Sequence, residues 1–209
     1  MKLAVSEIVT GVRHILQDTG ADRWTNAQLF HWLYEGQLAV LALAPVLFSE
    51  RTIIPMTATA EQTIPVGSHM LLQLIGVCDA NGKVTNALTP ISEAALFLED
   101  PAWMDGTPAM PLHSIRKTTE HQTFYLYPVP AQTGFLLVDH VPAISKPDSL
   151  QDELTLVDES VAAILTDYVL FRAFGEDADN QHNEGFSLKH KALYEEGMQK
   201  IMAGRGALK

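Results

Sequence analysis

The chain has 209 residues, of which 47% are hydrophobic, with one cysteine and a formal net charge of −11. The apolar content excludes a disordered chain, and the length suffices for one large domain or two small ones. No apolar run approaches the roughly 18 residues of a membrane span, and the single cysteine, Cys78, excludes an internal disulfide framework. Because Glu7 lies where a signal peptide would be apolar, we interpret the N-terminus as a helix and expect synthesis in a reducing cytoplasm.

Two helices are predicted at the N-terminus. Apolar residues at helical spacing predict a helix over residues 3–17, which Thr19-Gly20 ends. Thr25 and Gln28 form a capping-box pattern at the start of a second helix, which Pro45 ends. The apolar line of this helix is Leu29, Leu33, Gly36, Val40 and Leu43.

Two tryptophans belong to the second helix. Trp24 before the cap and Leu29 inside the helix fit a hydrophobic staple, and Trp32 lies beside the apolar line. A pair of tryptophans can also form a ligand cage. At helical spacing we favour the core interpretation.

From about Arg51 the residue pattern becomes typical of β-strands. Short β-branched runs broken by prolines predict edge strands and turns, and Asn81-Gly82 is a hairpin turn signal. We expect a short helix over 93–98 within an otherwise loop-rich stretch, followed by two alternating strands. The strand candidates are 52–55, 62–67, 71–77, 124–128 and 135–141.

Two more helices are predicted at the C-terminal end, with a break near Gly175. Asp158 is a candidate N-cap for the first of them. Its apolar stripe is Val161, Ile164, Leu165, Tyr168 and Phe171. In the second, Phe186, Leu193 and Ile201 keep an apolar line, with Gly197 on it where a neighbour could approach closely.

This order of elements predicts an α+β protein. The N- and C-terminal helices would form a four-helix bundle over residues 1–47 and 150–209, with an antiparallel β-rich domain inserted at 48–149. Residues 203–209 would be a flexible C-terminal arm, since Gly204 and Gly206 suit an arm better than a continuing helix. The expected bundle core is Leu29, Leu33, Val40, Val161, Leu165, Tyr168 and Phe171.

Charge is uneven along the C-terminal third. Residues 148–180 hold nine acids against Arg172, whereas Lys and Arg outnumber Glu over residues 187–209. These runs can be solvated helix faces, or an acidic surface that repels nucleic acid together with a basic tail that docks on a partner. No basic patch with interleaved aromatic residues indicates direct DNA binding.

No catalytic or metal-binding motif is found. His182 and His190 are eight residues apart, so they do not chelate as an i, i+4 pair would, and neighbouring Asp179 and Glu184 fit an ordinary helix surface. Cys78 would be a nucleophile only if the fold brought a base to it. Paired carboxylates for glycoside hydrolysis remain open, because such pairs are distant in sequence. We expect no enzyme activity, cofactor or metal.

Five segments in order resemble one protein family over nearly the whole chain. They are residues 24–37 (WTNAQLFHWLYEGQ), 62–67 (QTIPVG), 100–103 (DPAW), 124–128 (FYLYP) and 167–178 (DYVLFRAFGEDA). The pattern resembles the head-to-tail adaptor, or connector, proteins of short-tailed and related tailed bacteriophages, also called tail tubular proteins. Each segment alone is weak, and the ordered series is what carries the resemblance.

The resemblance implies a non-enzymatic virion protein of the tail or neck, assembled in the host cytoplasm. It implies a ring of about twelve copies below the portal, which also contacts a distal tail or nozzle protein and lets genomic DNA pass without specific binding. Another oligomeric scaffolding or binding protein, or an unrecognised hydrolase, are the alternatives. The expected portal-docking arm is Ile201, Met202, Arg205, Leu208 and Lys209. The expected acidic channel or subunit-interface surface is Asp152, Glu153, Asp158, Glu159, Glu176, Asp177 and Asp179.

Overall fold

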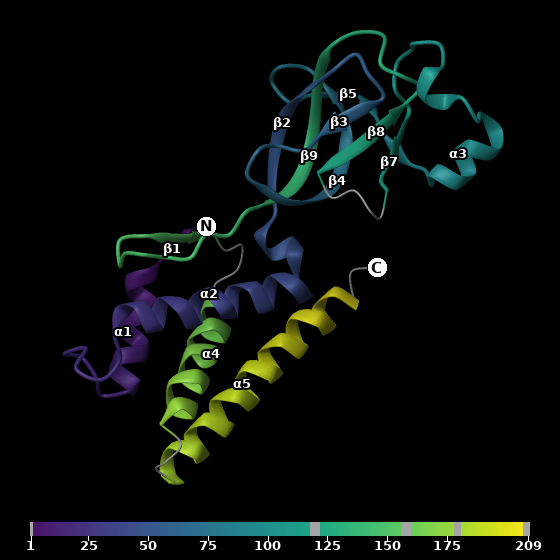
Figure 1. Ribbon diagram of the computed structural model, residues 1–209. Coiled ribbons are helices and arrows are strands. Elements are labelled where there is room, and N and C mark those ends of the chain that lie inside the picture. The colour runs from purple at the N-terminus through teal and green to yellow at the C-terminus, as the bar shows by residue number, and fades with distance from the viewer. Residues whose placement is uncertain (1, 118–121, 156–159, 178–180, 207–209) are drawn as a thin grey trace. The chain divides into compact units, whose positions relative to one another are not determined.

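The computed structural model describes residues 2–117, 122–155, 160–177 and 181–206, and it divides the chain into two compact units (Figure 1). The helical unit comprises Met1–Phe48 and Ile144–Lys209, and the β unit comprises Ser49–Ala143. The α+β class is as predicted, with antiparallel sheets between terminal helices that pack together. Residues 144–149, which we had expected in the β insertion, group with the helical unit.

The N-terminal helices form with small changes at their ends. Strand β1 (Lys2–Ala4) pairs with β10 (Glu153–Thr155), so helix α1 (Val5–Ile15) begins two residues later than predicted. Helix α2 (Asn26–Leu43) has the predicted capping box between Thr25 and Gln28. Trp24 and Trp32 are buried and meet edge to face at 5.4 Å, which confirms their core interpretation.

A buried ion pair fixes the loop between α1 and α2. Arg13 and Asp18 are 8% and 6% exposed and lie 2.9 Å apart. Arg13 also donates to the carbonyl oxygen of Trp24 at 2.8 Å, and Asp18 accepts backbone hydrogen bonds from Asp22, Arg23 and Trp24. Burial alone would raise the pKa of Asp18, but these hydrogen bonds and the charge of Arg13 outweigh it and hold the pKa below its ordinary value.

Helix α4 (Ser160–Glu176) is the centre of the helical unit, in place of the expected four-helix bundle. It contacts α1, α2 and α5 (Gln181–Gly206), and α2 crosses α4 instead of running alongside it (Figure 1). The break between α4 and α5 falls after residue 176, close to the predicted position. Asp158, the candidate N-cap, lies outside the described residues.

Glycines allow two of these close helix crossings. A Cβ on Gly36 of α2 would lie 3.0 Å from Tyr168 Cδ1, and one on Gly197 of α5 would lie 2.6 Å from Ile164 Cγ1. Real Cβ contacts are longer than the second distance, so α5 reaches α4 this closely only because residue 197 is glycine.

The apolar line predicted for α5 is only partly right. Gly197 and Ile201 do lie toward α4, but Phe186 and Leu193 are exposed, while His190 and Ser187 are buried instead. Ser187 donates to the carbonyl oxygen of Phe171 at 3.0 Å, so polar groups with specific partners complete this interface. Of the expected core, Tyr168 and Phe171 are half-buried, and the buried members are Leu29, Leu33, Val40, Val161 and Leu165.

The β unit consists of two four-stranded sheets. Their strand orders are β2-β9-β4-β5 and β3-β8-β7-β6, antiparallel apart from the β6–β7 pair. The predicted edge strands 52–55 and 62–67 correspond to β2 and β3, one at the edge of each sheet, but β3 ends at Thr63, so the prediction fails over residues 64–67. Pro55 lies opposite Phe135 of β9, and an edge strand tolerates a proline because its other side completes no ladder. The bounds are β2 Glu50–Met56, β3 Glu61–Thr63, β4 Ser68–Cys78, β5 Val84–Ala87, β6 Thr89–Pro90, β7 His113–Ile115, β8 Thr123–Tyr127 and β9 Gly134–Pro142.

Alternating side chains of β8 face two different hydrophobic clusters. Phe124 and Leu126 belong to the main cluster, which strands β2, β4 and β9 complete. Tyr125 points the other way and packs with Ile115, Leu96 and Trp103. Leu96 belongs to helix α3 (Glu93–Glu99), the predicted short helix, and Trp103 to the 3-10 helix η2 (Trp103–Asp105); a second 3-10 helix, η1, spans Pro45–Phe48.

Replacing Asp18 by Asn leaves Arg13 buried without its charged partner. We expect the free energy of unfolding at neutral pH to fall by about 2 kcal/mol. Because the pKa of Asp18 is lower in the folded chain, its contribution is complete above about pH 4 and disappears as the pH falls through the folded pKa. Urea unfolding should therefore show a difference in the free energy of unfolding between the wild-type and Asp18→Asn proteins that becomes smaller as the pH falls into the acid range. The control is Glu196→Gln, which removes an exposed ion pair with Lys200 and should change little.

Two glycines of α5 should respond to alanine with opposite signs. Gly185→Ala meets no atom within 4 Å and should raise the free energy of unfolding by about 0.5–1 kcal/mol through helix propensity. Gly197→Ala gains the same propensity but collides with Ile164, and a net loss of about 1 kcal/mol is expected. Thermal unfolding of the two variants measures this difference. Equal shifts of the melting temperature in both variants would contradict the close crossing of α5 and α4.

Candidate functional site

One histidine of α5, His190, pairs with one acid of α4, Asp167. His190 Nδ1 lies 2.8 Å from Asp167 Oδ1, and its ring stacks on Phe174 at 5.8 Å between centroids. This pair joins α5 to α4, so His190 is not available to a ligand with His182. Among the described residues no group of three or more His, Cys, Asp and Glu side chains could hold a metal ion.

Cys78 ends strand β4 and has the environment of a structural thiol. Burial, and secondarily the charge of Asp79, raise the pKa of Cys78 above its ordinary value. The thiolate is the nucleophilic form, so this shift makes Cys78 less reactive at neutral pH.

A buried Ser–His pair was not predicted from the sequence. Ser68 Oγ lies 2.8 Å from His140 Nδ1, across the β4–β9 pair, and both side chains are buried. The sequence gives no signal for it, because the two residues are 72 positions apart. A buried hydroxyl cannot reach a substrate, and we interpret the pair as a clamp between the ends of two strands.

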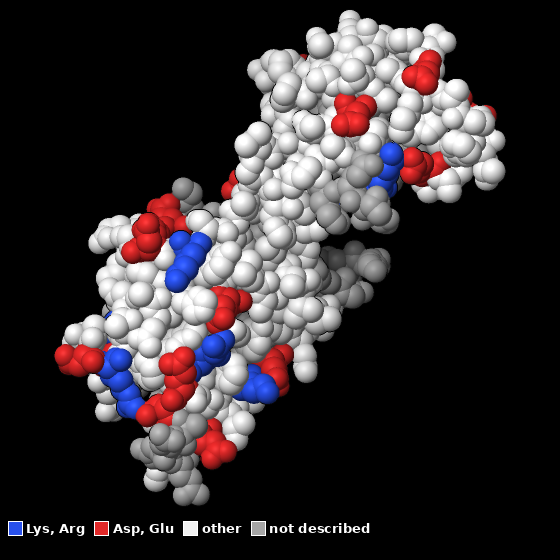
Figure 2. All heavy atoms as spheres, in the orientation of Figure 1, with Lys and Arg blue, Asp and Glu red and all other residues white. Residues whose placement is uncertain are grey.

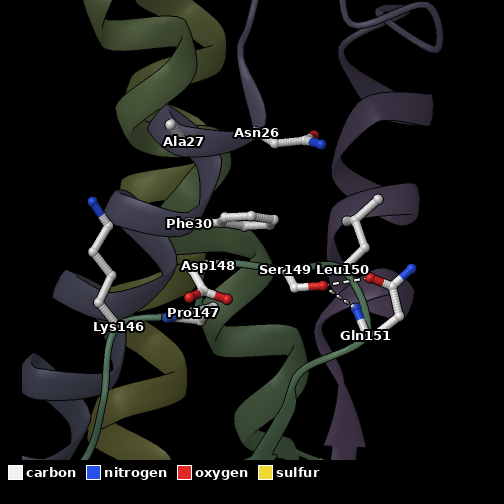
Figure 3. A pocket seen from close by; sticks show the side chains of 9 residues that line it. All are labelled: Asn26, Ala27, Phe30, Lys146, Pro147, Asp148, Ser149, Leu150 and Gln151. Atoms are coloured by element: carbon white, nitrogen blue, oxygen red, sulfur yellow. Dashed lines mark hydrogen bonds between the residues drawn. The ribbon is translucent and has the colours of Figure 1, made fainter.

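A cleft of about 660 Å³ lies in the helical unit between the start of α2 and the loop 146–151 (Figure 3). The apolar part of its lining is Ala27 and Phe30 of α2 with Pro147 and Leu150 of the loop, and the rest of the lining is polar. Lys146 lies at one side of the view, and the lining is completed by Asn26, Asp148, Ser149 and Gln151.

The loop that forms this cleft is held by its own polar groups. Asp152 Oδ2 accepts hydrogen bonds from the backbone N–H groups of Asp148 and Ser149. Carbonyl oxygens of Leu150 and Asp152 accept from the first N–H groups of α1, at Ser6 and Val5. These hydrogen bonds hold the loop that forms one wall of the cleft in place.

The predicted acidic surface is divided between the two ends of α4. Asp152 and Glu153 precede α4, whereas Glu176 is its last residue and Asp177 follows it, so the two groups are separated by about 25 Å of helix. Asp177 accepts from Asn183 and forms an ion pair with Arg23. On the face shown in Figure 2 the acidic side chains form scattered groups, not one patch. Asp158, Glu159 and Asp179 lie outside the described residues.

The first part of the predicted C-terminal arm, residues 203–206, is helical. Helix α5 continues through Gly206, so residues 203–206 belong to the helix and the prediction that glycines end it is wrong. The hydrogen bonds of a long helix outweigh the roughly 1 kcal/mol that a single glycine costs. Ile201 is half-buried and Met202 exposed, and Leu208 and Lys209 lie outside the described residues. Docking of this segment on a portal stays a prediction.

Large exposed apolar side chains are the features that the sequence did not locate. They occur in both units and include Val66, Phe97, Leu98, Leu188 and Met202. Such residues gather where proteins contact one another. None of the described helices is long and apolar enough to cross a membrane.

The sequence profile described as SU10 adaptor protein matches residues 3–208. The chain therefore belongs to the SU10 adaptor protein family, a family of phage adaptor proteins, which confirms the resemblance drawn from the sequence. No curated protein matches the chain.

Cys78 should remain unmodified in the folded protein. We expect Ellman's reagent at neutral pH to react slowly with the native chain and to release one equivalent in denaturant, because unfolding removes the burial that raises the thiol pKa. Rapid stoichiometric reaction of the native protein would contradict the assignment.

Proposed function

We propose that this chain is the head-to-tail adaptor of a phage virion, and that its copies form a ring below the portal. The observation that carries the proposal is the family match, which spans both the helical unit and the β unit. We expect about twelve copies, which join their neighbours through heterologous contacts that close into a ring. The ring would lie in the tail or neck and bind the portal on one side and a distal tail or nozzle protein on the other.

Exposed apolar side chains support a protein that completes its surface by assembly. Leu98 and Leu188 are 86% and 61% exposed on helices, where burial in a contact would recover hydrophobic free energy. The cleft at Phe30, whose lining combines apolar and polar side chains, gives the helical unit a pocket for a partner's side chain.

The net charge supports a passive role toward DNA. A channel wall with an excess of carboxylates neutralises no phosphates and releases no counterions, so DNA would slide past it without binding. The net charge of −11 suits such a wall. We assign this role to the acids at both ends of α4, among them Glu153 and Glu176.

Electron microscopy of the purified chain, alone and mixed with portal rings of the same phage, tests the proposal. We expect density for a ring of about twelve copies on one end of the portal, and portal alone as the control should lack it. A chain that remains monomeric without the portal is compatible with assembly on a template. Failure to add to portal rings under conditions in which the chain is folded would refute the proposal.

A further inference from the structure

The β unit presents an apolar surface on α3 and η2. Phe97, Leu98 and Met104 are 57%, 86% and 41% exposed. Phenylalanine and methionine are typical of protein-binding surfaces. We define the α3–η2 surface as Phe97, Leu98, Glu99, Met104 and Asp105.

This surface is held firmly from below. Leu96 and Trp103, which alternate with the exposed residues, are almost completely buried, and Trp103 meets Tyr125 edge to face at 5.7 Å. Ser92 caps α3 by accepting from the N–H of Ala95 at 3.2 Å. Phe97 and Leu98 are thus exposed on a helix that is already anchored. Binding of a partner would therefore cost little conformational entropy for ordering α3.

Negative charge predominates around the surface, where the one base that pairs with α3 is Lys117 among the residues that the structure describes. Residues 84–112 contain four acids, Glu93, Glu99, Asp100 and Asp105, and no Lys or Arg. Asp100 is engaged with the N–H of Ala102, and Glu93 pairs with Lys117, whereas Glu99 and Asp105 are exposed beside the apolar residues. A complementary partner therefore combines apolar side chains with positive charge.

The chain contains one segment of that composition at its C-terminal end. Residues 197–209 hold Lys200, Arg205 and Lys209, no acid, and the apolar Ile201, Met202 and Leu208. Within the described part, Met202 is 52% exposed and the Lys200 side chain 74% exposed.

We propose that the α3–η2 surface binds the last part of this segment, residues 200–209, of a second copy of the chain, while Gly197 and Met198 stay packed in their own helical unit. The choice of a second copy rests on the proposed function, because two different patches that bind each other make the heterologous contact from which rings are built. The segment that the sequence directs to a portal thereby has its binding site on the neighbouring subunit.

A fluorescent peptide of residues 200–209, titrated with the full-length chain, tests the site by anisotropy. Leu98→Ser should weaken binding about tenfold, since it removes an apolar anchor. The matched control is Val66→Ser, which removes an equally exposed apolar side chain elsewhere in the β unit. Equal affinities for the Leu98→Ser and Val66→Ser proteins would overturn the assignment.

Charge reversal gives a second readout. The double variant Glu99→Lys, Asp105→Lys should bind the peptide with an affinity at least tenfold lower. It should instead bind a peptide in which the three basic residues are replaced by glutamate. Glu50→Lys with Glu61→Lys makes the same change in net charge at other exposed sites of the β unit and should retain most of the affinity. Similar losses in both double variants would mean that net charge, not this site, attracts the peptide. Circular dichroism and thermal unfolding verify that each variant is folded.

Sedimentation of mixed full-length variants distinguishes a second copy from the same chain. The Glu99→Lys, Asp105→Lys protein and the Lys200→Glu, Arg205→Glu protein should each fail to self-associate. Their mixture should associate, because each surface then meets a segment of opposite charge. Absence of association in the mixture would overturn the proposal.

The proposed function is measured separately, by addition of the wild-type chain to portal rings. Rings that form normally with the Leu98→Ser variant would therefore refute this inference and leave the proposed function standing.

Discussion

The helical unit depends on how closely its other helices approach α4. Gly36 and Gly197 let α2 and α5 cross α4 where any larger residue would collide, and this closeness brings Leu33, Val161 and Leu165 into one buried core. Dense packing of this kind supplies most of the stability of such a unit, because dispersion and burial scale with contact. The polar contacts between helices, such as His190 with Asp167, then fix which faces meet.

The same packing explains why α5 has exposed apolar residues. Its interface with α4 includes Ser187, His190 and Gly197, and Phe186 packs on Phe174 with one side exposed. The side chains of Leu188 and Leu193 are exposed. A monomer gains nothing from exposing them. These apolar side chains are therefore available for contact with other proteins, which agrees with membership in an adaptor family.

The β unit separates stability from recognition within a few residues. Leu96 and Trp103 anchor α3 and η2 to the outer face of β8, while their neighbours Phe97, Leu98 and Met104 face away from the core. An adaptor benefits from this arrangement, since a rigid contact surface binds with less entropic loss than a mobile loop. Most of the ordered polar structure, including the Arg13–Asp18 pair and the turn around Asp152, likewise serves to fix loops in place.

Local sequence by itself determined the elements whose signals are local: the Thr25 capping box, the short helix at 93–98, the Asn81-Gly82 turn and the edge strands with their prolines. Each of these depends on hydrogen bonds or backbone angles within a few residues. The ordered motifs also determined the family. Only the tertiary structure decided that α4 is central, that α5 packs through Ser187 and His190, and that Leu98 is exposed. Those outcomes depend on which surfaces far apart in sequence meet, and helical periodicity alone cannot distinguish an apolar residue buried in the core from one left for a partner.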